Sequence, residues 1–592
     1  MKKYTLIILG LLFVTTSCKK DTKQEEEKTL PPISDVFASY YEEGLQLNPL
    51  SATMAGDNRY NDRLPNFITQ EFIEEARAYF TRYKARLADY DKSKLTESER
   101  LNYEILNWEC NINLEELDYP TYLLPLNQFG SLPHFMGQLA GGTSMQPFKT
   151  VEDYKNWLAR LDQYIAWCDT AVVNMKRGIQ EGYVLPKTLT VKVMPQVAVF
   201  AKGPVEEHLF FMPVKNLPAD FSEAEKKELT DAYKKMVGEK IIPTYKKLET
   251  FLKEEYLPAG RETSGIASLP GGKEYYDLQI KNFTTTTMSA DEIHQLGLNE
   301  VARLEAEMEK VKSRVGFKGT LKEFFDHVRT KKELMPFTDP QQVIDHFNAI
   351  HEKMKPHLKK LFDLVPKTDF EVRRTEAFRE ASASAEYNPG SLDGSRPGIF
   401  YVPIPRVEEY NIFSDEDLFL HEAIPGHHYQ ISLQQENEAL PDFRKMLWYS
   451  AYGEGWALYT ESLGEELGLY EDPYQYFGML GAEMHRAIRL VVDTGLHSKG
   501  WTREQAIQYS LDHEAESEAS IISEIERYMA IPGQALSYKV GQLKILELRA
   551  RAEDKLGDKF DIREFHNRVL ESGGMPLQML EDKIDDWIAS KE

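Results

Sequence analysis

The chain has 592 residues, of which 42% are hydrophobic and 28% are charged, and its formal net charge is −24. This composition is typical of a folded protein rather than a disordered one, and the length is sufficient to bury a large core. An acidic body repels nucleic acid and anionic membrane surfaces. We therefore expect no nucleic-acid partner.

The N-terminal segment differs in composition from the rest of the chain. A basic start, MKK, precedes the apolar run YTLIILGLLFV and the small residues TTSC. This pattern predicts a secretory signal over residues 1–17, too short to span a bilayer as a mature helix. Cys18 resembles the lipidated cysteine of a bacterial lipoprotein, and the charged residues 18–32 resemble a flexible tether. The alternative is an ordinary cleaved signal followed by a free cysteine.

These features predict where the protein resides. A lipid on Cys18 would anchor the chain to a membrane of the cell envelope, on a periplasmic or surface face. Lys19 stands where an aspartate would favour retention at the inner membrane, so this position resembles outer-membrane sorting. The sequence carries no signal for an oligomeric state.

Helical periodicity dominates the remainder. Apolar residues recur at spacings of three and four, and several predicted helices open with a capping residue. No solenoid repeat is present. The short loops and the continuous helical pattern favour one large, mainly α unit, with an N-terminal half over 33–280 and a C-terminal half over 281–592. The clearest helix signals are the stripe over 72–90, Thr96 with Glu99, Ser289 with Glu292 ending at Gly316, and Asp339 with Pro340.

Strand signals are few. The segments DFEVRRTEAF (369–378) and GIFYVPIP (398–405) flank a loop rich in Gly, Ser and Pro. The second segment could lie beside the metal-binding helix as an edge strand that pairs with an extended peptide, or it could be a buried strand of the core.

Besides Cys18, the chain has two cysteines, Cys110 and Cys168, both in helical contexts rich in aromatic residues. Two cysteines in an exported chain can form a disulfide or remain buried thiols. The sequence leaves both alternatives open.

The most distinctive stretch is HEAIPGHH, residues 421–428. It begins like the zinc-peptidase signature H-E-x-x-H, but Pro425 stands in place of the second histidine. Ser414 and Asp417 predict a helix start, and the apolar residues after them carry His421 and Glu422 into the core. Burying these two groups is costly unless they are paired or bound, and a zinc peptidase needs this pair as ligand and general base.

The proline determines which histidine joins His421. Pro425 lacks an N–H and clashes with the preceding turn, and Gly426 permits a kink. A two-residue bulge at this point would bring His427 round to the face of His421, so we predict His427 as the second ligand. His428 then supports a ligand or contacts the substrate; the alternative is that His428 is itself the ligand.

A third ligand is expected from YSAYGEGWALYTESLGEELG, residues 449–468. We predict Glu454, and a His/His/Glu set favours Zn²⁺. Glu461 is the alternative ligand, or the partner that orients a ligand histidine. Without the histidine motif, this segment would be interpreted as an amphipathic helix with solvated acids.

Four stretches, HEAIPGHHYQ, YGEGWALYTE, RLVVDTGLHSKGW and YMAIPGQALSYKVGQLKI, together resemble the bacterial lipoprotein family called domain of unknown function 885. The family resembles the helical zinc peptidases known as gluzincins, which include carboxypeptidases. This resemblance implies a large helical zincin-like peptidase fold with a small β element beside the metal helix. It also implies a metallopeptidase activity, with a bias toward the C-terminal end of the substrate.

Three further residues are candidates for catalysis. Tyr538 is expected to hold the developing oxyanion, and Arg527 to bind a substrate carboxylate or to brace an acid. His497 forms an i, i+4 pair with Asp493; it is either part of a structural hydrogen bond or a transition-state donor.

The sequence thus predicts an envelope-anchored zinc metallopeptidase that cleaves short peptides as an exopeptidase, with Glu422 activating water. One alternative is a non-catalytic lipoprotein that binds peptides or partners and holds a structural metal. Another is a zinc amidase or ester hydrolase, because metal, base and oxyanion donor are common to all of these reactions.

Overall fold

The computed structural model describes residues 30–141, 145–376, 380, 383–390 and 396–592. The predicted signal over 1–17, Cys18 and most of the tether lie outside the described residues. The first helix begins at Ile33, directly after Pro31 and Pro32. The predicted tether ends at residue 32, immediately before this helix.

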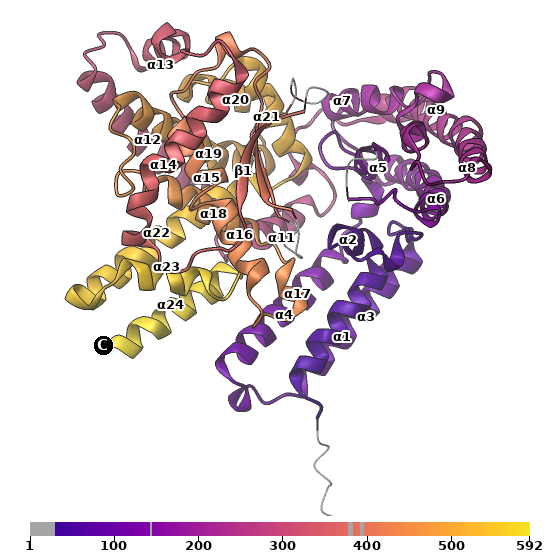
Figure 1. Cartoon of the computed structure of the whole chain (residues 1–592), viewed down its shortest axis with the longest axis horizontal. Coiled ribbons are helices and arrows are strands. Elements are labelled where there is room, and N and C mark those ends of the chain that lie inside the picture. The colour runs from indigo at the N-terminus through magenta and orange to yellow at the C-terminus, as the bar shows by residue number, and fades with distance from the viewer. Residues whose placement is uncertain (1–29, 142–144, 377–379, 381–382, 391–395) are drawn as a thin grey trace, which may run out of the picture.

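The fold is mainly α-helical, as predicted, with one small sheet (Figure 1). The first segment contains α1 (Ile33–Leu47), α2 (Pro49–Met54), α3 (Gln70–Ala88) and α4 (Glu97–Glu116). The second contains α5 (Leu132–Ala140), α6 (Val151–Glu181), α7 (Lys187–Ala198), α8 (Glu223–Lys235), α9 (Ile242–Phe251) and α10 (Leu257–Ala259).

The C-terminal elements surround the candidate site. Before the sheet lie α11 (Gly272–Thr284), α12 (Ala290–Arg314), α13 (Leu321–Thr330) and α14 (Pro340–Leu361). After the sheet come α15 (Asp415–Glu422), α16 (His427–Glu436), α17 (Asp442–Lys445), α18 (Ser450–Glu461) and α19 (Pro473–His497). The chain ends with α20 (Arg503–His513), α21 (Glu518–Ala530), α22 (Ser537–Leu556), α23 (Ile562–Leu570) and α24 (Leu577–Lys591).

The capping signals are confirmed. Capping boxes join Thr96 to Glu99 at the start of α4 and Ser289 to Glu292 at the start of α12. Gly316, just beyond α12, has a φ of 78°, a left-handed conformation that favours glycine. Ser414 precedes α15 as predicted, but its side chain makes no capping hydrogen bond.

Two hydrophobic cores organise the molecule. The smaller core draws its buried residues from between Leu64 and Tyr256, mainly from α5–α9, which form a lobe at one side (Figure 1). The larger core combines α1, α3 and α4 with the elements from α11 onward. The division predicted at residues 280 and 281 stays a prediction. The cores show, however, that α1, α3 and α4 pack largely with the C-terminal part.

The sheet has three strands in the order β1 (Phe370–Arg374), β3 (Gly398–Val402), β2 (Glu386–Asn388). β1 pairs with β3 in parallel, and β2 pairs with β3 in the antiparallel sense. Every residue of β3 is buried. The interpretation of this segment as an edge strand open to a peptide is therefore wrong, because both of its edges already have a partner.

Helices α18 and α22 pack with their backbones in contact. A Cβ added at Gly541 of α22 would lie 1.9 Å from the carbonyl oxygen of Ala451, and one at Gly455 of α18 would lie 2.5 Å from the Gly541 backbone. Neither position can accept a side chain without separating the helices. The two glycines thus fix α18 against α22.

Across the described residues, no helix combines the length and apolarity needed to cross a membrane.

The two described cysteines give a testable consequence of this fold. Cys110 lies in the larger core and Cys168 in the smaller one, both as buried free thiols. Burial raises the pKa of each thiol to about 12. In protein produced from Lys19 onward, we expect a thiol reagent to label neither cysteine in the native state and both after unfolding. Recovery of a peptide cross-linked through Cys110 and Cys168 from unreduced protein would contradict this arrangement.

Candidate metal centre

The motif at 421–428 forms a break between two helices. α15 ends at Glu422, and α16 begins at His427 with Gly426 as its N-terminal cap. The predicted bulge inside one continuous helix is therefore wrong, since four residues separate the two helices. The predicted consequence is present nevertheless. The turn through Pro425 and Gly426 brings His427 toward His421.

Close packing and two hydrogen bonds from α18 hold this break. A Cβ on Gly426 would lie 1.9 Å from the carbonyl oxygen of His421 and 2.3 Å from that of Leu420, so only glycine fits. The Thr460 hydroxyl donates to the Leu420 oxygen at 3.0 Å, and the Trp456 indole donates to the Pro425 oxygen at 2.8 Å. Carbonyls that lose a helical partner at the break are thereby satisfied.

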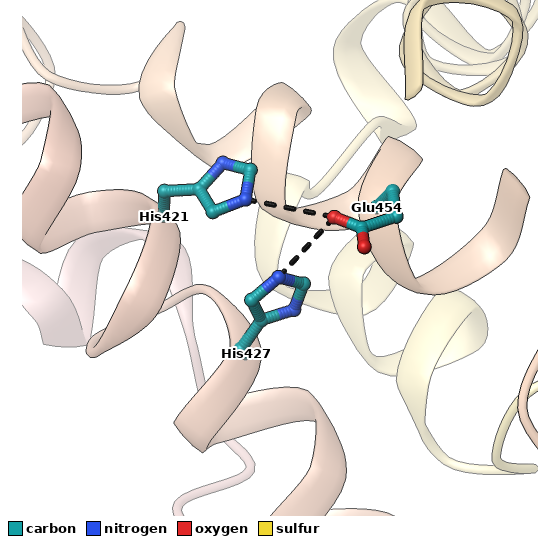
Figure 2. A group of neighbouring side chains, drawn as sticks. All are labelled: His421, His427 and Glu454. Atoms are coloured by element: carbon teal, nitrogen blue, oxygen red, sulfur yellow. Dashed lines mark ion pairs between the residues drawn. The ribbon is translucent and has the colours of Figure 1, made fainter. Parts of the chain in front are cut away.

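Three side chains converge across the break (Figure 2). Nε2 of His421 lies 3.6 Å from Oε2 of Glu454, and Nε2 of His427 lies 3.3 Å from the same oxygen. One potential ligand atom from each residue lies within 4.8 Å of the other two. The two imidazole rings are nearly perpendicular, at 87°, with centroids 4.8 Å apart. We call His421, His427 and Glu454 the trio.

The trio fits a metal ion by donor type and spacing. Two imidazole nitrogens and one carboxylate oxygen form a ligand set of catalytic zinc sites, which leaves a fourth position open. Ligands bound tetrahedrally at about 2.0–2.1 Å lie roughly 3.3–3.4 Å from one another. The distances of 3.3 and 3.6 Å from Oε2 of Glu454 agree with this value.

The charges of the trio also favour a cation. Burial lowers the pKa of His421, but its hydrogen bonds to Glu454 and Glu461 raise it by more, to about 10. Burial raises the pKa of Glu454, but the neighbouring His427 and His421 hold it well below its usual range. The buried carboxylates thus stabilise positive charge in this site, either on protonated histidines or on a bound cation. A metal ion would compete with protons for the same imidazoles.

Glu461 occupies the orienting position. Nδ1 of His421 donates to Oε1 of Glu461 at 2.7 Å, and Glu461 is only 1% exposed. This bond places the proton of His421 on Nδ1 and leaves Nε2 to face Glu454. Of the two roles considered for Glu461, the geometry supports the partner of a ligand histidine, with Glu454 as the ligand.

Glu422, the expected general base, lies at the end of α15 and is buried. Burial raises its pKa, while His421 and His427 lower it and Glu454 raises it. In the described part of the chain, no side chain or backbone group forms a hydrogen bond with its carboxylate. A buried acid without a protein partner beside two imidazoles is free to exchange a proton with a bound molecule.

His428 faces the sheet. Its Nδ1 lies 2.9 Å from the Tyr387 hydroxyl and 3.3 Å from the Ser432 hydroxyl, and its ring packs on Phe370 of β1 at 4.9 Å. Burial lowers the pKa of His428 to about 4, so the ring is neutral near pH 7. The structure does not bring His428 into the trio, and its contacts are those of a residue that attaches α16 to the sheet.

His497 is also engaged elsewhere. Its Nδ1 accepts from the Ile266 amide at 3.0 Å, and its Nε2 donates to the Tyr528 carbonyl at 3.0 Å. Burial lowers its pKa to about 3. The expected hydrogen bond between His497 and Asp493 is wrong, because Asp493 accepts from the Tyr276 hydroxyl instead. With both ring nitrogens bound to backbone, the geometry does not favour His497 as a proton donor.

Tyr538, at the start of α22, lies beside Arg527 of α21. The Arg527 Nη2 is 3.5 Å from the Tyr538 hydroxyl, and a second guanidinium, Arg489 of α19, sits 4.5 Å over the Tyr538 ring. The Ser537 hydroxyl contacts that of Ser450, one helical turn before Glu454, at 2.7 Å. Tyr538 therefore begins its helix beside the helix that carries the acid of the trio.

Sequence reasoning did not assign roles to two residues near these groups. Arg489 is 6% exposed, and its Nη1 is buried without a hydrogen-bond partner among the described residues. The Trp448 ring lies 5.8 Å from that of His427. The sequence could have suggested Arg489, which lies in the quoted stretch RLVVDTGLHSKGW. It gave no signal for Trp448, since proximity to His427 depends on how the 437–449 connection folds.

Comparisons with known proteins agree on family and fold. A family model described as a bacterial protein of unknown function (DUF885) matches residues 49–584. A crystal structure described as that of a candidate lipoprotein from Colwellia psychrerythraea has 29% identity and a TM-score of 0.86, covering 94% of this chain and 99% of that one. A structure from Shewanella oneidensis, at 19% identity, has a TM-score of 0.73 over 93% and 99% of the two chains, and shows the same fold. No curated protein matches.

None of these matches describes a peptidase or a metal. The predicted resemblance to gluzincins therefore depends on the residues of the trio and Glu422 alone.

The break itself can be tested by substitution. Gly426→Ala would force a methyl group against two carbonyl oxygens, so we expect a loss of unfolding free energy of about 1–3 kcal/mol or more. Gly481→Ala is the matched control, because Gly481 lies inside α19 with open space around its Cβ position. That change should be neutral or stabilising by about 0.5–1 kcal/mol. Denaturant unfolding followed by circular dichroism measures both, and equal stability of the two variants would refute the packing argument.

Proposed function

The chain belongs to the bacterial DUF885 family, and we propose that it is an envelope-anchored, zinc-dependent metallopeptidase that hydrolyses short peptides. One observation carries the proposal. His421 and His427 point to a single oxygen of Glu454, and the unpartnered carboxylate of Glu422 follows His421 directly in the chain. This combination supplies metal ligands, an open position and a base in one place.

The trio, Glu422 and Glu461 would each have a separate role in peptide hydrolysis. His421, His427 and Glu454 would hold a zinc ion, which supplies Lewis acidity toward the scissile carbonyl and toward a water molecule. Glu422 takes a proton from the attacking water and passes it to the leaving amine, which departs as the C–N bond breaks. Burial raises its pKa, which makes the carboxylate a better proton acceptor than an exposed glutamate. Glu461 keeps His421 in the required tautomer.

Tyr538 and the arginines beside it support cleavage at the C-terminal end of the peptide. The Tyr538 hydroxyl would donate to the oxygen that gains charge during attack. Arg527 and Arg489 place two guanidinium groups around Tyr538. Both pair with Glu524, at 3.2 and 2.9 Å, so Arg527 braces an acid, but Nη1 of Arg489 has no hydrogen-bond partner among the described residues. That N–H group would be available to the free carboxylate of a peptide C-terminus. We therefore favour a carboxypeptidase-like exopeptidase.

A large cavity supports a short peptide as substrate. Its volume is about 1010 Å³, and it lies between the N-terminal helices and the connection from α17 to α18. This size is at the upper end of the range for small-molecule sites. Residues of the first four helices and Met446 line the same space, so the two parts of the chain would enclose the substrate together.

The N-terminal sequence supports attachment to the cell envelope. Cys18 follows a secretory signal, and the similar Colwellia protein is described as a candidate lipoprotein. We propose that a lipid on Cys18 anchors the protein, with outer-membrane sorting favoured by Lys19. The described chain would then act on peptides in the periplasm or at the surface.

Metal content and hydrolysis test the proposal together. We expect purified protein to contain about one zinc ion per chain, measured by plasma mass spectrometry, and to cleave a defined peptide pool in a chelator-sensitive way. Glu422→Gln should keep the zinc and lose about 10²- to 10⁴-fold in rate, because the proton acceptor is removed. Glu438→Gln, at an exposed glutamate in a turn, is the control.

Three results would redirect the assignment. Wild-type protein without zinc, together with undiminished cleavage by Glu422→Gln, would refute the peptidase. Loss of the fold on chelation would indicate a structural metal in a binding protein. Zinc-dependent cleavage of N-acyl amides or esters with an untouched peptide pool would indicate another hydrolase.

The orienting role of Glu461 is tested by metal affinity. Glu461→Ala should weaken zinc binding about 10- to 100-fold, since the hydrogen bond to His421 is lost. Glu461→Gln keeps an acceptor oxygen and should fall between the alanine variant and wild type. Competition with a chromophoric chelator measures the affinity, and Glu465→Gln at an exposed position of the same segment is the control. Equal affinities in all four proteins would remove Glu461 from the site.

A further inference from the structure

An exposed tryptophan borders the trio. Trp448 is 46% exposed, and its ring centroid lies 5.8 Å from that of His427 at an interplanar angle of 58°. The ring also lies against α18, where a Cβ added at Gly453 would fall 2.2 Å from its far edge. Gly453 immediately precedes Glu454. Trp448 therefore lies against both segments that carry the more accessible members of the trio.

Glu454 and His427 are the more exposed members of the trio. The side chains of Glu454 and His427 are 15% and 11% exposed, whereas those of His421 and Glu461 are 5% and 1% exposed. A molecule that reaches the trio past Glu454 and His427 comes within range of the Trp448 ring, which lies beside both.

A large cavity adjoins the segment that carries Trp448. Met446 and Leu447, which precede Trp448, line the cavity of about 1010 Å³. Met446 is 41% exposed, and Phe129 and Phe67 on the opposite, N-terminal part of the lining are 50% and 38% exposed. Large apolar side chains that stay exposed around one hollow are typical of a binding site rather than of ordinary surface.

We infer that Trp448 forms the wall of a subsite for a bulky apolar, preferably aromatic, side chain of a peptide, next to the position that the trio would act on. The inference rests on the proposed function for its location relative to the scissile bond. An aromatic side chain can pack edge-to-face or offset on the indole, whereas a small or charged side chain gains nothing from that surface. The exposed apolar side chains around the cavity favour this occupant over an acidic or basic segment.

Equilibrium binding tests the subsite without requiring turnover. Two peptides that differ only by Phe or Ala at one position are titrated by calorimetry into the full folded chain carrying Glu422→Gln, as purified. We expect the Phe peptide to bind about tenfold more tightly. Adding Trp448→Ala should abolish this preference, and Trp448→Phe should retain most of it.

Two further variants separate the ring from general damage. Gly453→Ala inserts a methyl group at the edge of the indole and should displace the ring, so it should reduce the preference although alanine favours the helix. Val365→Ala removes an exposed apolar side chain that does not line the cavity and should change nothing. Zinc content should stay equal to that of the parent in every variant.

The outcomes distinguish this inference from the proposed function. If peptides are cleaved but Trp448→Ala leaves the ratio of kcat/KM for Phe and Ala substrates unchanged, the subsite is refuted and the peptidase stands. If no peptide is cleaved but the Phe preference exists and depends on Trp448, the peptidase is refuted and the subsite stands. Equal binding of the two peptides by the Trp448-containing protein refutes the subsite in either case.

Discussion

The site depends on hydrogen bonds to the backbone carbonyl groups that have no helical partner where α15 ends. Pro425 prevents the helix from continuing, and Gly426 lets α16 start within van der Waals distance of the α15 backbone. Thr460 and Trp456 of α18 then donate hydrogen bonds to the carbonyl oxygens of Leu420 and Pro425. The same helix carries Glu454 between the two histidines. The contacts that stabilise the break therefore also position the acid opposite it.

Charge follows from this geometry. Glu454 and Glu461 approach His421 from two sides, one at each ring nitrogen. Burying two carboxylates is unfavourable unless positive charge accompanies them, and two imidazoles supply it only by binding protons or a cation. Glu422 lies beside this charged group but takes no part in its hydrogen bonds. An acid in that position is more easily explained by chemistry than by stability.

Local signals in the sequence predicted much of the fold and the trio. Thr96 and Ser289 mark helix starts because a capping residue acts within one turn of its own position. The Pro425–Gly426 pair likewise predicts a turn from local sequence alone. What the sequence could not supply were contacts between distant segments. The pairing of β3 on both edges, the attachment of His428 to Tyr387 and the two backbone partners of His497 all depend on tertiary packing. The contact between Trp448 and His427 depends on tertiary packing in the same way.

The glycine contact between α18 and α22 has a further consequence. Where two backbones touch with no side chain between them, neither helix can slide or tilt without collision, so the pair behaves as one rigid strut. Glu454 sits on one member and Tyr538 on the other. The backbone positions of Glu454 and Tyr538 are thereby held at a fixed separation by the helix contact. The absence of a Cβ at Gly455 and Gly541 therefore sets the distance between these two helices.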